Sequence, residues 1–223
     1  MRSANFDSRH QMPDERGIAH ASRREAALAR VIGPYVRGKA VLNFGCREGH
    51  LAAAMFLEAA SINSIDVSPI AISRATELAP PNASFEASQL LHVSFAGYDV
   101  IAAIECLDYL SPTEQEAFFC KLAREHAGKV FILSAPIIGS NEYRTYFTDS
   151  GIRQTFARHG LSFVEGRNLN AYRKAGVGAT IAAAICGRPW GRALLDVLPE
   201  SYVYQRCYVA PCTAAPGRIS GFP

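Results

Sequence analysis

The sequence lacks several features that would point to particular classes of protein. The net charge is only +3 over 223 residues and there is no dense Lys/Arg run, so nothing favours a nucleic-acid partner. No apolar run is long enough to span a membrane, because the most apolar later stretch, 175–186, is short and interrupted by glycine. Residues 1–18 are polar and contain no apolar segment of a secretory signal. We therefore expect a cytoplasmic protein with neither a membrane nor a nucleic-acid partner.

The cysteines form no recognisable metal-binding pattern. None of the six belongs to a C-x-x-C pair, and no histidine spacing accompanies them. Most lie within apolar runs, as buried, reduced thiols do. The sequence therefore predicts no metal site.

The segment Lys39–Leu51, KAVLNFGCREGHL, organises the chain. A short apolar run is followed by Gly45 and Gly49 and then by an Ala-rich run, which indicates a buried strand, a tight loop and a helix. Asp66 follows seventeen residues after Gly49, at the end of a second apolar run. An acid at this place binds ribose hydroxyls in doubly wound sheets, so the pattern favours a nucleoside-type cofactor.

Strands and helices alternate along the rest of the chain, which predicts an α/β fold with parallel strands and right-handed crossovers. A first helix should end at Gly33-Pro34, and Ser68-Pro69 and the capping box Ser111–Glu114 should start two others. Expected strands are 39–44, 62–66, 83–86, 98–104, 129–134, 161–169 and 202–209, and expected helices are 50–60, 69–79, 112–126 and 149–159.

Four stretches, VLNFGCREGHLA, SIDVSPIAISRA, YDVIAAIECLDYLSP and KVFILSAP, resemble the successive motifs of the class I S-adenosylmethionine-dependent methyltransferases. With DSGIRQTFARHGLSFVEG, which is similar to the family's late helix and sixth strand, the resemblance covers residues 39–169. The YLSP turn and the IDVSP segment are loosely similar to small-molecule methyltransferases, including nodulation N-methyltransferases.

The resemblance implies a doubly wound, Rossmann-like, mostly parallel seven-stranded sheet with helices on both faces and an antiparallel last strand. We expect an N-terminal arm and helix over 1–38, and a methyltransferase-like domain over 39–210 with an apolar helical insertion at 175–198. A flexible tail should follow over 211–223.

The resemblance also implies S-adenosyl-L-methionine as the cofactor. Gly45 and Gly49 would hold its methionine half, Asp66 its ribose, and Val67 would flank the adenine. The full set of expected cofactor-binding residues is Asn43, Gly45, Cys46, Arg47, Gly49, Asp66, Val67, Ser88, Gln89 and Glu105.

Three residues depart from the family pattern. Asn43 replaces an acid, Arg47 replaces the middle glycine of the loop, and Ser88 replaces an acid near the adenine. A side chain at the position of Arg47 is unusual where the backbone needs a positive φ. If the loop tolerates it, Arg47 could pair with the cofactor carboxylate; if not, the loop no longer binds a cofactor.

The candidate catalytic residues are Asp108 and Tyr109, in the turn after the fourth expected strand. Related enzymes often have a histidine at the place of Tyr109, and a tyrosine is a weaker base, so it is expected to orient the substrate. The alternative is that Asp108 supports the turn and Tyr109 packs. The polar, aromatic segment 141–146 could line an acceptor pocket or form an ordinary surface loop. The insertion could cover that pocket, pair two subunits as a homodimer or, as the slightly favoured alternative, form a plain core helix.

Three functions remain open at this stage. The first is methylation of an O or N atom of a small-molecule acceptor, such as a sugar or a secondary metabolite. The second is a non-catalytic binding protein on a degenerate methyltransferase fold, suggested by the three departures. The third is an NAD(P)-dependent oxidoreductase, against which the loop spacing G-x-x-x-G argues, because that class uses G-x-G-x-x-G.

Overall fold

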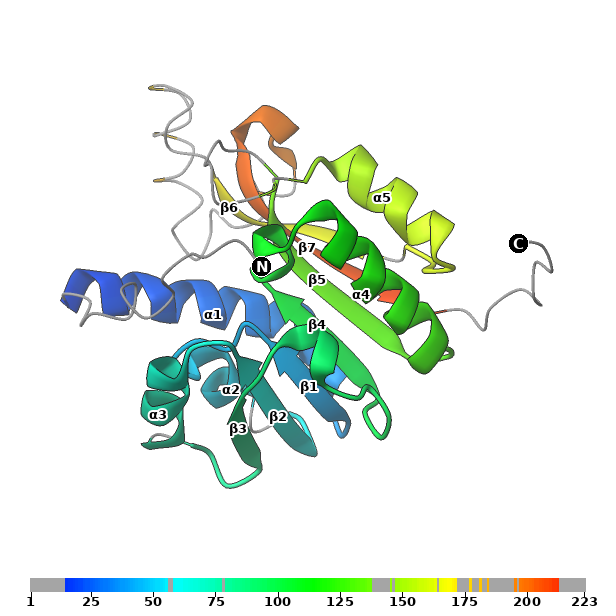
Figure 1. The fold of residues 1–223 in the computed structure, drawn as a ribbon. Helices are drawn as coiled ribbons and strands as arrows, with labels where there is room; N and C mark the ends of the chain where they lie inside the picture. Colours follow the sequence, from blue (N-terminus) through cyan, green and yellow to red (C-terminus); the bar gives the residue numbers. More distant parts are fainter. Residues whose placement is uncertain are drawn as a thin grey trace.

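The computed structural model describes residues 15–55, 58–77, 79–137, 145, 147–163, 165–171, 177, 181, 184, 195 and 197–212. Among these residues, seven strands form one sheet in the order β3-β2-β1-β4-β5-β7-β6 (Figure 1). The strands are β1 (Ala40–Phe44), β2 (Ser61–Asp66), β3 (Ala83–Ala87), β4 (Val100–Ile104), β5 (Val130–Pro136), β6 (Glu165–Ala171) and β7 (Val203–Pro211). The first five pair in parallel, and β7 runs antiparallel to both β5 and β6. The predicted doubly wound, mostly parallel sheet with an antiparallel last strand is confirmed.

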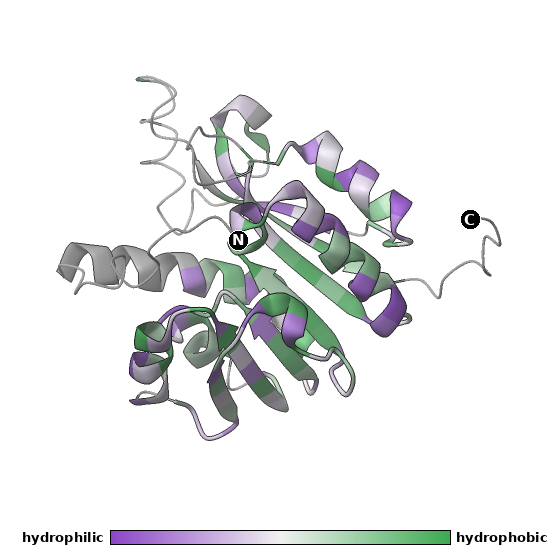
Figure 2. Cartoon of the chain, in the orientation of Figure 1, coloured by the Kyte–Doolittle hydropathy of each residue, from purple (hydrophilic) through white to green (hydrophobic). Residues whose placement is uncertain are grey.

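The two faces of the sheet are covered by different helices. Helices α1 (Glu15–Val36) and α2 (His50–Met55) pack on one face, where aliphatic side chains such as Ile32, Met55 and Val100 form the core. Helices α4 (Pro112–Glu125) and α5 (Asp149–Arg158) pack on the other face, over rings such as those of Phe118 and Phe131. Helix α3 (Pro69–Glu77) lies beside β2 and β3. Strands β4 and β5 are hydrophobic along most of their length (Figure 2), as expected for strands buried on both faces.

The predicted helix starts are confirmed by their hydrogen bonds. Ser111 Oγ accepts from the backbone N–H of Glu114, and the Glu114 carboxylate accepts from the backbone N–H of Ser111 at 2.9 Å. Ser68 Oγ accepts from the N–H of Ala71 at 3.2 Å at the start of α3. Short polar motifs therefore determined these ends locally.

The prediction that the first helix ends at Gly33-Pro34 is wrong. Helix α1 continues to Val36 with Pro34 inside it, although proline removes one helical hydrogen bond. Ile32 and Val36, four residues apart, are both fully buried against the sheet. Burial of this apolar stripe outweighs the local cost.

The sixth strand is also displaced from its predicted range of 161–169. Strand β6 is the more polar segment Glu165–Ala171 at the edge of the sheet, whereas Leu161 makes only an isolated bridge with Cys212. Phe163 instead packs against the Tyr208 ring, with 6.3 Å between ring centroids. An edge strand needs little hydrophobicity, so an apolar run misled the prediction here.

Other boundaries differ by less. The described part of the helix after Gly49 is α2 (His50–Met55), and Glu58 already lies in a turn before β2, so the helix does not reach the predicted end at residue 60. The last strand extends to Pro211, two residues beyond the predicted end. Several segments that the sequence analysis singled out lie outside the described residues. They are the polar N-terminal segment 1–14, the candidate acceptor residues 141–144 and 146, most of the insertion 175–198, and residues 213–223. No helix in the described part of the chain combines the length and hydropathy of a membrane crossing.

Candidate cofactor site

The candidate residues gather where the parallel strands end. Phe44, the last residue of β1, is level with Ile65 of β2 and Ala103 of β4. The loop 45–49, Asp66 and Glu105 therefore leave the sheet side by side at its carboxyl edge. This edge, between β1 and the strands on either side of it, is where open α/β sheets bind ligands.

The loop after β1 requires glycine at both predicted positions. Gly45 has φ +76°, and a Cβ there would lie 2.3 Å from the backbone oxygen of Ile104. Gly49 has φ +80°, and a Cβ there would lie 3.1 Å from Ala75 and the Phe85 ring. The first glycine lets the loop press against β4, and the second lets the start of α2 pack on α3 and β3.

Arg47 adopts the left-handed conformation that a glycine would adopt, with φ +52°. Its backbone N–H donates to Asp66 Oδ2 at 2.9 Å, while the N–H of Ser68 donates to Asp66 Oδ1 at 3.1 Å. The carboxylate at the tip of β2 thus holds the loop after β1 in place. Each carboxylate oxygen can accept more than one hydrogen bond, so these bonds leave Asp66 further acceptor capacity.

Asn43 lies fully buried beneath the loop. Its amide Nδ2 donates weakly to Ser64 Oγ at 3.4 Å. Its Oδ1 atom has no hydrogen-bond partner within the described part of the chain. A neutral amide is less costly to bury than the usual acid, and its carbonyl oxygen remains an acceptor below the loop.

Glu48 ties the loop to the next helix, which the sequence analysis missed. Its carboxylate pairs with Arg74 of α3 at 2.9 Å and approaches His50 Nε2 at 3.6 Å. No local pattern connects residues 48 and 74, because only the β1–α2–β2–α3 path brings them together.

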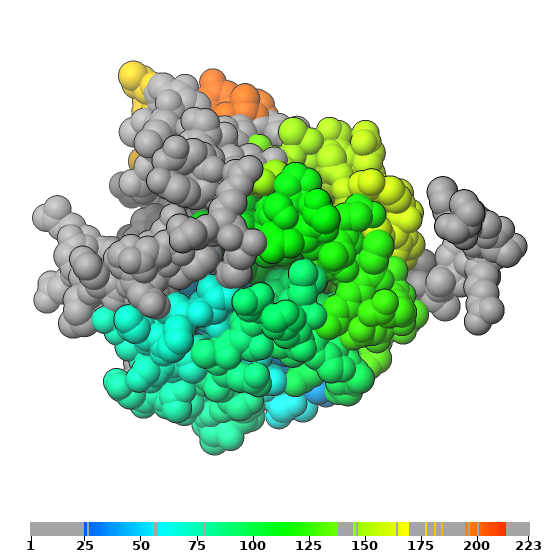
Figure 3. All heavy atoms as spheres, in the orientation of Figure 1, coloured from blue at the N-terminus to red at the C-terminus, as the bar shows by residue number. Residues whose placement is uncertain are grey.

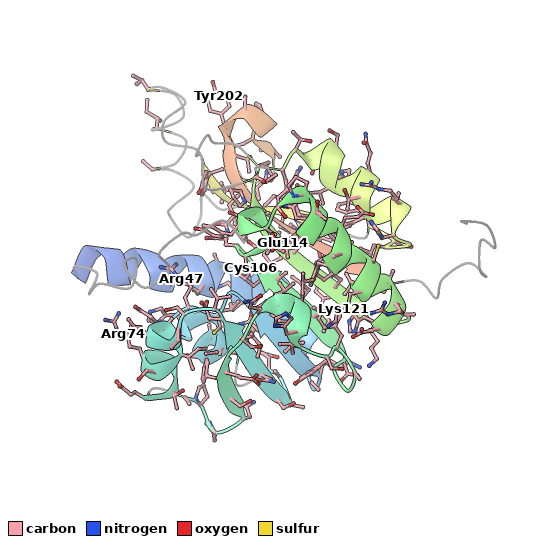
Figure 4. The ribbon with its side chains drawn as sticks, in the orientation of Figure 1. Arg47, Arg74, Cys106, Glu114, Lys121 and Tyr202 are labelled. Atoms are coloured by element: carbon pink, nitrogen blue, oxygen red, sulfur yellow. The ribbon has the colours of Figure 1, made fainter. Side chains whose placement is uncertain are left out.

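Glu105 is the second residue other than glycine with a positive φ, at +49°, among the described residues. Its backbone N–H donates to the Ser134 carbonyl oxygen at 2.8 Å, which anchors the turn after β4 to β5. Burial, with smaller contributions from Asp108 and Asp66, raises the pKa of the neighbouring Cys106 thiol well above its usual value. In Figure 4 the Arg47 and Cys106 side chains lie at this edge, whereas Lys121 lies farther along α4.

The adenine-side residues follow β2 and β3. The N–H of Ser88 donates to the backbone oxygen of Asp66 at 2.9 Å, which places the two residues side by side. Val67 and Ser88 are half-buried and Gln89 is exposed. The structure thus brings the predicted set together along one edge.

The two candidate catalytic residues differ in exposure. Both lie in the 3-10 turn η3 (Leu107–Tyr109), where the Asp108 side chain is fully buried and Tyr109 is half-buried. Gln115 of α4 holds this turn by donating to the backbone oxygens of Leu107 at 2.9 Å and Leu110 at 3.3 Å. Sequence reasoning missed Gln115, although it follows the capping box directly.

The strand order with a reversed seventh strand, together with the glycine loop and the acid after β2, defines the class I methyltransferase fold. Residues 41–126 match the family model described as a methyltransferase domain. No curated protein matches the sequence significantly. The chain therefore has the class I methyltransferase fold, and its residues 41–126 are similar to a methyltransferase domain. The match gives no support to the oxidoreductase alternative.

Solved structures of low sequence identity share the fold. Magnesium protoporphyrin IX methyltransferase from Synechocystis, with bound SAH, is 15% identical with a TM-score of 0.62, over 90% of this chain and 87% of that chain. The 1,6-didemethyltoxoflavin-N1-methyltransferase from Burkholderia thailandensis is 15% identical with a TM-score of 0.66, over 94% of this chain and 86% of that chain. The [4+2]-cyclase SpnF is 15% identical with a TM-score of 0.61, over 84% of this chain and 81% of that chain.

Proposed function

We propose that the carboxyl edge of this sheet binds S-adenosyl-L-methionine and that the protein methylates an O or N atom of a small molecule, such as a sugar or a secondary metabolite. The observation that carries the proposal is the closure of the loop after β1 by Asp66, through the N–H of Arg47 at 2.9 Å. This contact keeps the loop in a glycine-like conformation despite the arginine.

The residues fit the cofactor by chemical type. The loop 45–49 would hold the methionine half, Asp66 would accept from the ribose hydroxyls, and Val67, Ser88 and Gln89 would surround the adenine. The buried Asn43 oxygen offers an acceptor beneath the loop. Glu105 and Cys106 would border the cofactor at the tip of β4. The cofactor supplies a methyl group on a sulfonium, which is both electrophile and leaving group.

The protein's part in methyl transfer is mainly to align the acceptor. Tyr109 is half-buried and would orient the acceptor through its hydroxyl. Asp108 is fully buried and would support the turn that carries Tyr109. The acceptor is proposed as a small molecule because two proteins of this fold methylate small molecules by their names, magnesium protoporphyrin IX and 1,6-didemethyltoxoflavin.

Calorimetric titration with S-adenosylmethionine and S-adenosylhomocysteine tests the cofactor proposal. Asp66→Asn should weaken the binding of both ligands by about 10-fold to 100-fold, since hydrogen bonds to a charged group contribute about 1.5–3 kcal/mol. Asp99→Asn is the matched control. Asp99 Oδ2 also accepts a backbone N–H, that of Ala40 at 2.9 Å, at the opposite end of β1.

The control variant should bind both ligands as tightly as the wild type. Absence of binding by folded wild-type protein would refute the cofactor proposal. Equal weakening in both variants would mean that Asp66 acts through stability alone.

A second candidate is a protein of this fold that does not transfer methyl groups. The departures at Asn43 and Arg47 favour it, and the [4+2]-cyclase SpnF is a protein of similar fold named for another reaction. If cofactor binding occurs only after Arg47→Gly, the natural loop does not bind the cofactor, and this candidate is supported.

A further inference from the structure

Three side chains with different metal-binding atoms meet on the outer surface of α4 and α5. Glu116 and Cys120 are four residues apart on α4, and His159 directly follows α5. One ligand atom from each, a carboxylate oxygen, Sγ and a ring nitrogen, lie within 4.8 Å of one another. The two helices lie side by side on one face of the molecule (Figures 1 and 3).

The spacing of these atoms is close to that around a tetrahedral metal ion. His159 Nε2 is 3.1 Å from Glu116 Oε1, and Cys120 Sγ is 4.0 Å from the same oxygen. Usual zinc bond lengths place a nitrogen and an oxygen about 3.3 Å apart, and a sulfur and an oxygen about 3.6 Å apart, at tetrahedral angles. The two distances to Glu116 Oε1 are thus within a few tenths of an ångström of those values, and all three atoms lie within 4.8 Å of one another.

The histidine is already held in position. Its ring stacks on Phe119 with 5.6 Å between centroids and 24° between planes, and its side chain is only 8% exposed. The buried Nε2 atom faces Glu116 Oε1 at 3.1 Å, and no contact to it within the described residues has hydrogen-bond geometry. An imidazole held by stacking, with its Nε2 facing a thiol and a carboxylate, is a pre-organised metal ligand.

The neighbouring arginine leaves one carboxylate oxygen for the metal. Arg158 Nη1 lies 3.7 Å from Glu116 Oε2, whereas Oε1 faces Cys120 and His159. The Arg158 side chain is 61% exposed, so it can turn away into solvent as the metal enters.

We propose that Glu116, Cys120 and His159 form a surface site for a borderline-soft divalent metal ion such as Zn²⁺, with water completing the coordination. Binding would release the thiol proton, as thiolate ligation of zinc requires. The ion would link α4 to α5 and stabilise the native protein, since the ligands come together only in the fold. The spacing of cysteine and histidine along the sequence gave no sign of the site, because its ligands come from α4 and from the residue that follows α5.

Alkylation of Cys120 in the folded protein, followed by peptide mass mapping, provides a direct test. Cys120 is the exposed thiol among the described cysteines, and mapping separates it from every other cysteine. At free Zn²⁺ ten times the dissociation constant, its alkylation should slow about tenfold. Mg²⁺ should give no protection, because it does not bind thiolates.

Two variants distinguish a three-ligand site from zinc bound to a lone thiol. His159→Gln and Glu116→Gln keep Cys120 available for alkylation and should lose most of the zinc protection. His92→Gln removes an exposed histidine elsewhere and should keep it. Circular dichroism verifies the fold of each variant.

Cobalt provides an independent readout. Wild-type protein with Co²⁺ should show a thiolate-to-metal charge-transfer absorption that Cys120→Ser abolishes. Equal zinc protection of wild type and both folded ligand variants would overturn the proposal, as would absence of protection in the wild type. None of these outcomes depends on cofactor binding.

Discussion

The two ends of the parallel sheet use glycine for different reasons. At the amino end, strands are preceded by Gly38, Gly97 and Gly128, whose φ angles lie between +65° and +86°. A Cβ on any of these three glycines would meet nothing within 4 Å. At the carboxyl end, Gly45 and Gly49 also have positive φ, but a Cβ there would press on neighbouring backbone or side chains. The amino-end glycines serve only the turn, whereas the carboxyl-end glycines also permit close packing of a loop.

The carboxyl end also holds both described residues other than glycine with positive φ, Arg47 and Glu105. Such conformations cost about 1–3 kcal/mol each and persist only when surrounding contacts enforce them. Here the Asp66 carboxylate and the Ser134 carbonyl oxygen supply those contacts. Backbone strain is therefore concentrated where the cofactor is proposed to bind.

The largest expected effect is that of Gly45→Ala. Overpacking against the Ile104 carbonyl and a positive φ together should lower the free energy of unfolding by about 2–5 kcal/mol. Gly97→Ala is the matched variant at the amino end. It should lower the free energy of unfolding by only about 1–2 kcal/mol, because the positive φ is its only cost. Urea unfolding measures both, and equal losses would refute the distinction between the two ends.

A smaller effect is expected at Arg47. Arg47→Val should lower the free energy of unfolding by about 1–2 kcal/mol, because a β-branched residue tolerates a positive φ poorly. Arg47→Ala keeps the φ preference of an ordinary residue and should unfold like the wild type. Urea unfolding compares the two variants.

The same Arg47→Ala variant, titrated with S-adenosylmethionine, separates side chain from backbone. About tenfold weaker binding would place the guanidinium on the cofactor carboxylate. Unchanged binding would leave Arg47 a role through its backbone N–H only.

The smallest expected effect belongs to the amino end. His126 is fully buried there, and its Nε2 lies 2.9 Å from the Val130 carbonyl oxygen. Burial lowers the pKa of His126, with Lys129 adding to the effect, so the unfolded chain takes up a proton first as the pH falls. Stability should thus decrease as the pH falls below about 6.5, the usual pKa of histidine, and be unaffected by this group above it.

Replacing His126 by Gln should flatten that part of the stability profile, measured by urea unfolding between about pH 7.5 and 5.5. Glu114 at the carboxyl end serves as an internal contrast. Hydrogen bonds from the Ser111 backbone and side chain lower the pKa of Glu114 from 4.5 to about 2. The contribution of Glu114 to stability is therefore lost only below about pH 4.5, outside the measured range of about pH 7.5 to 5.5. If the stability of His126→Gln still decreased with falling pH in that range, the assignment of this pH dependence to His126 would be contradicted.

The sequence-based prediction was correct where the deciding interactions are local in the sequence, and wrong where they join distant residues. The capping box at Ser111 and the strand–loop–helix around Gly45 depend on neighbours within a few residues, and both were predicted correctly. The end of α1 was missed because the burial of Ile32 and Val36 against the sheet overrides Pro34. Strand β6 was misplaced because an edge strand pairs through its backbone and needs no apolar pattern.

The sequence by itself determined the order of strands and helices, the tight loop after β1 and the acid after β2, since glycine, proline and capping residues act locally. Only the tertiary structure decided that Asp66 holds the backbone of Arg47, that Glu48 pairs with Arg74, and that Cys120 faces His159. These contacts join residues 19 to 39 positions apart, as the numbers of their partners show. Packing of the sheet and helices, rather than any local preference, brings such partners within reach.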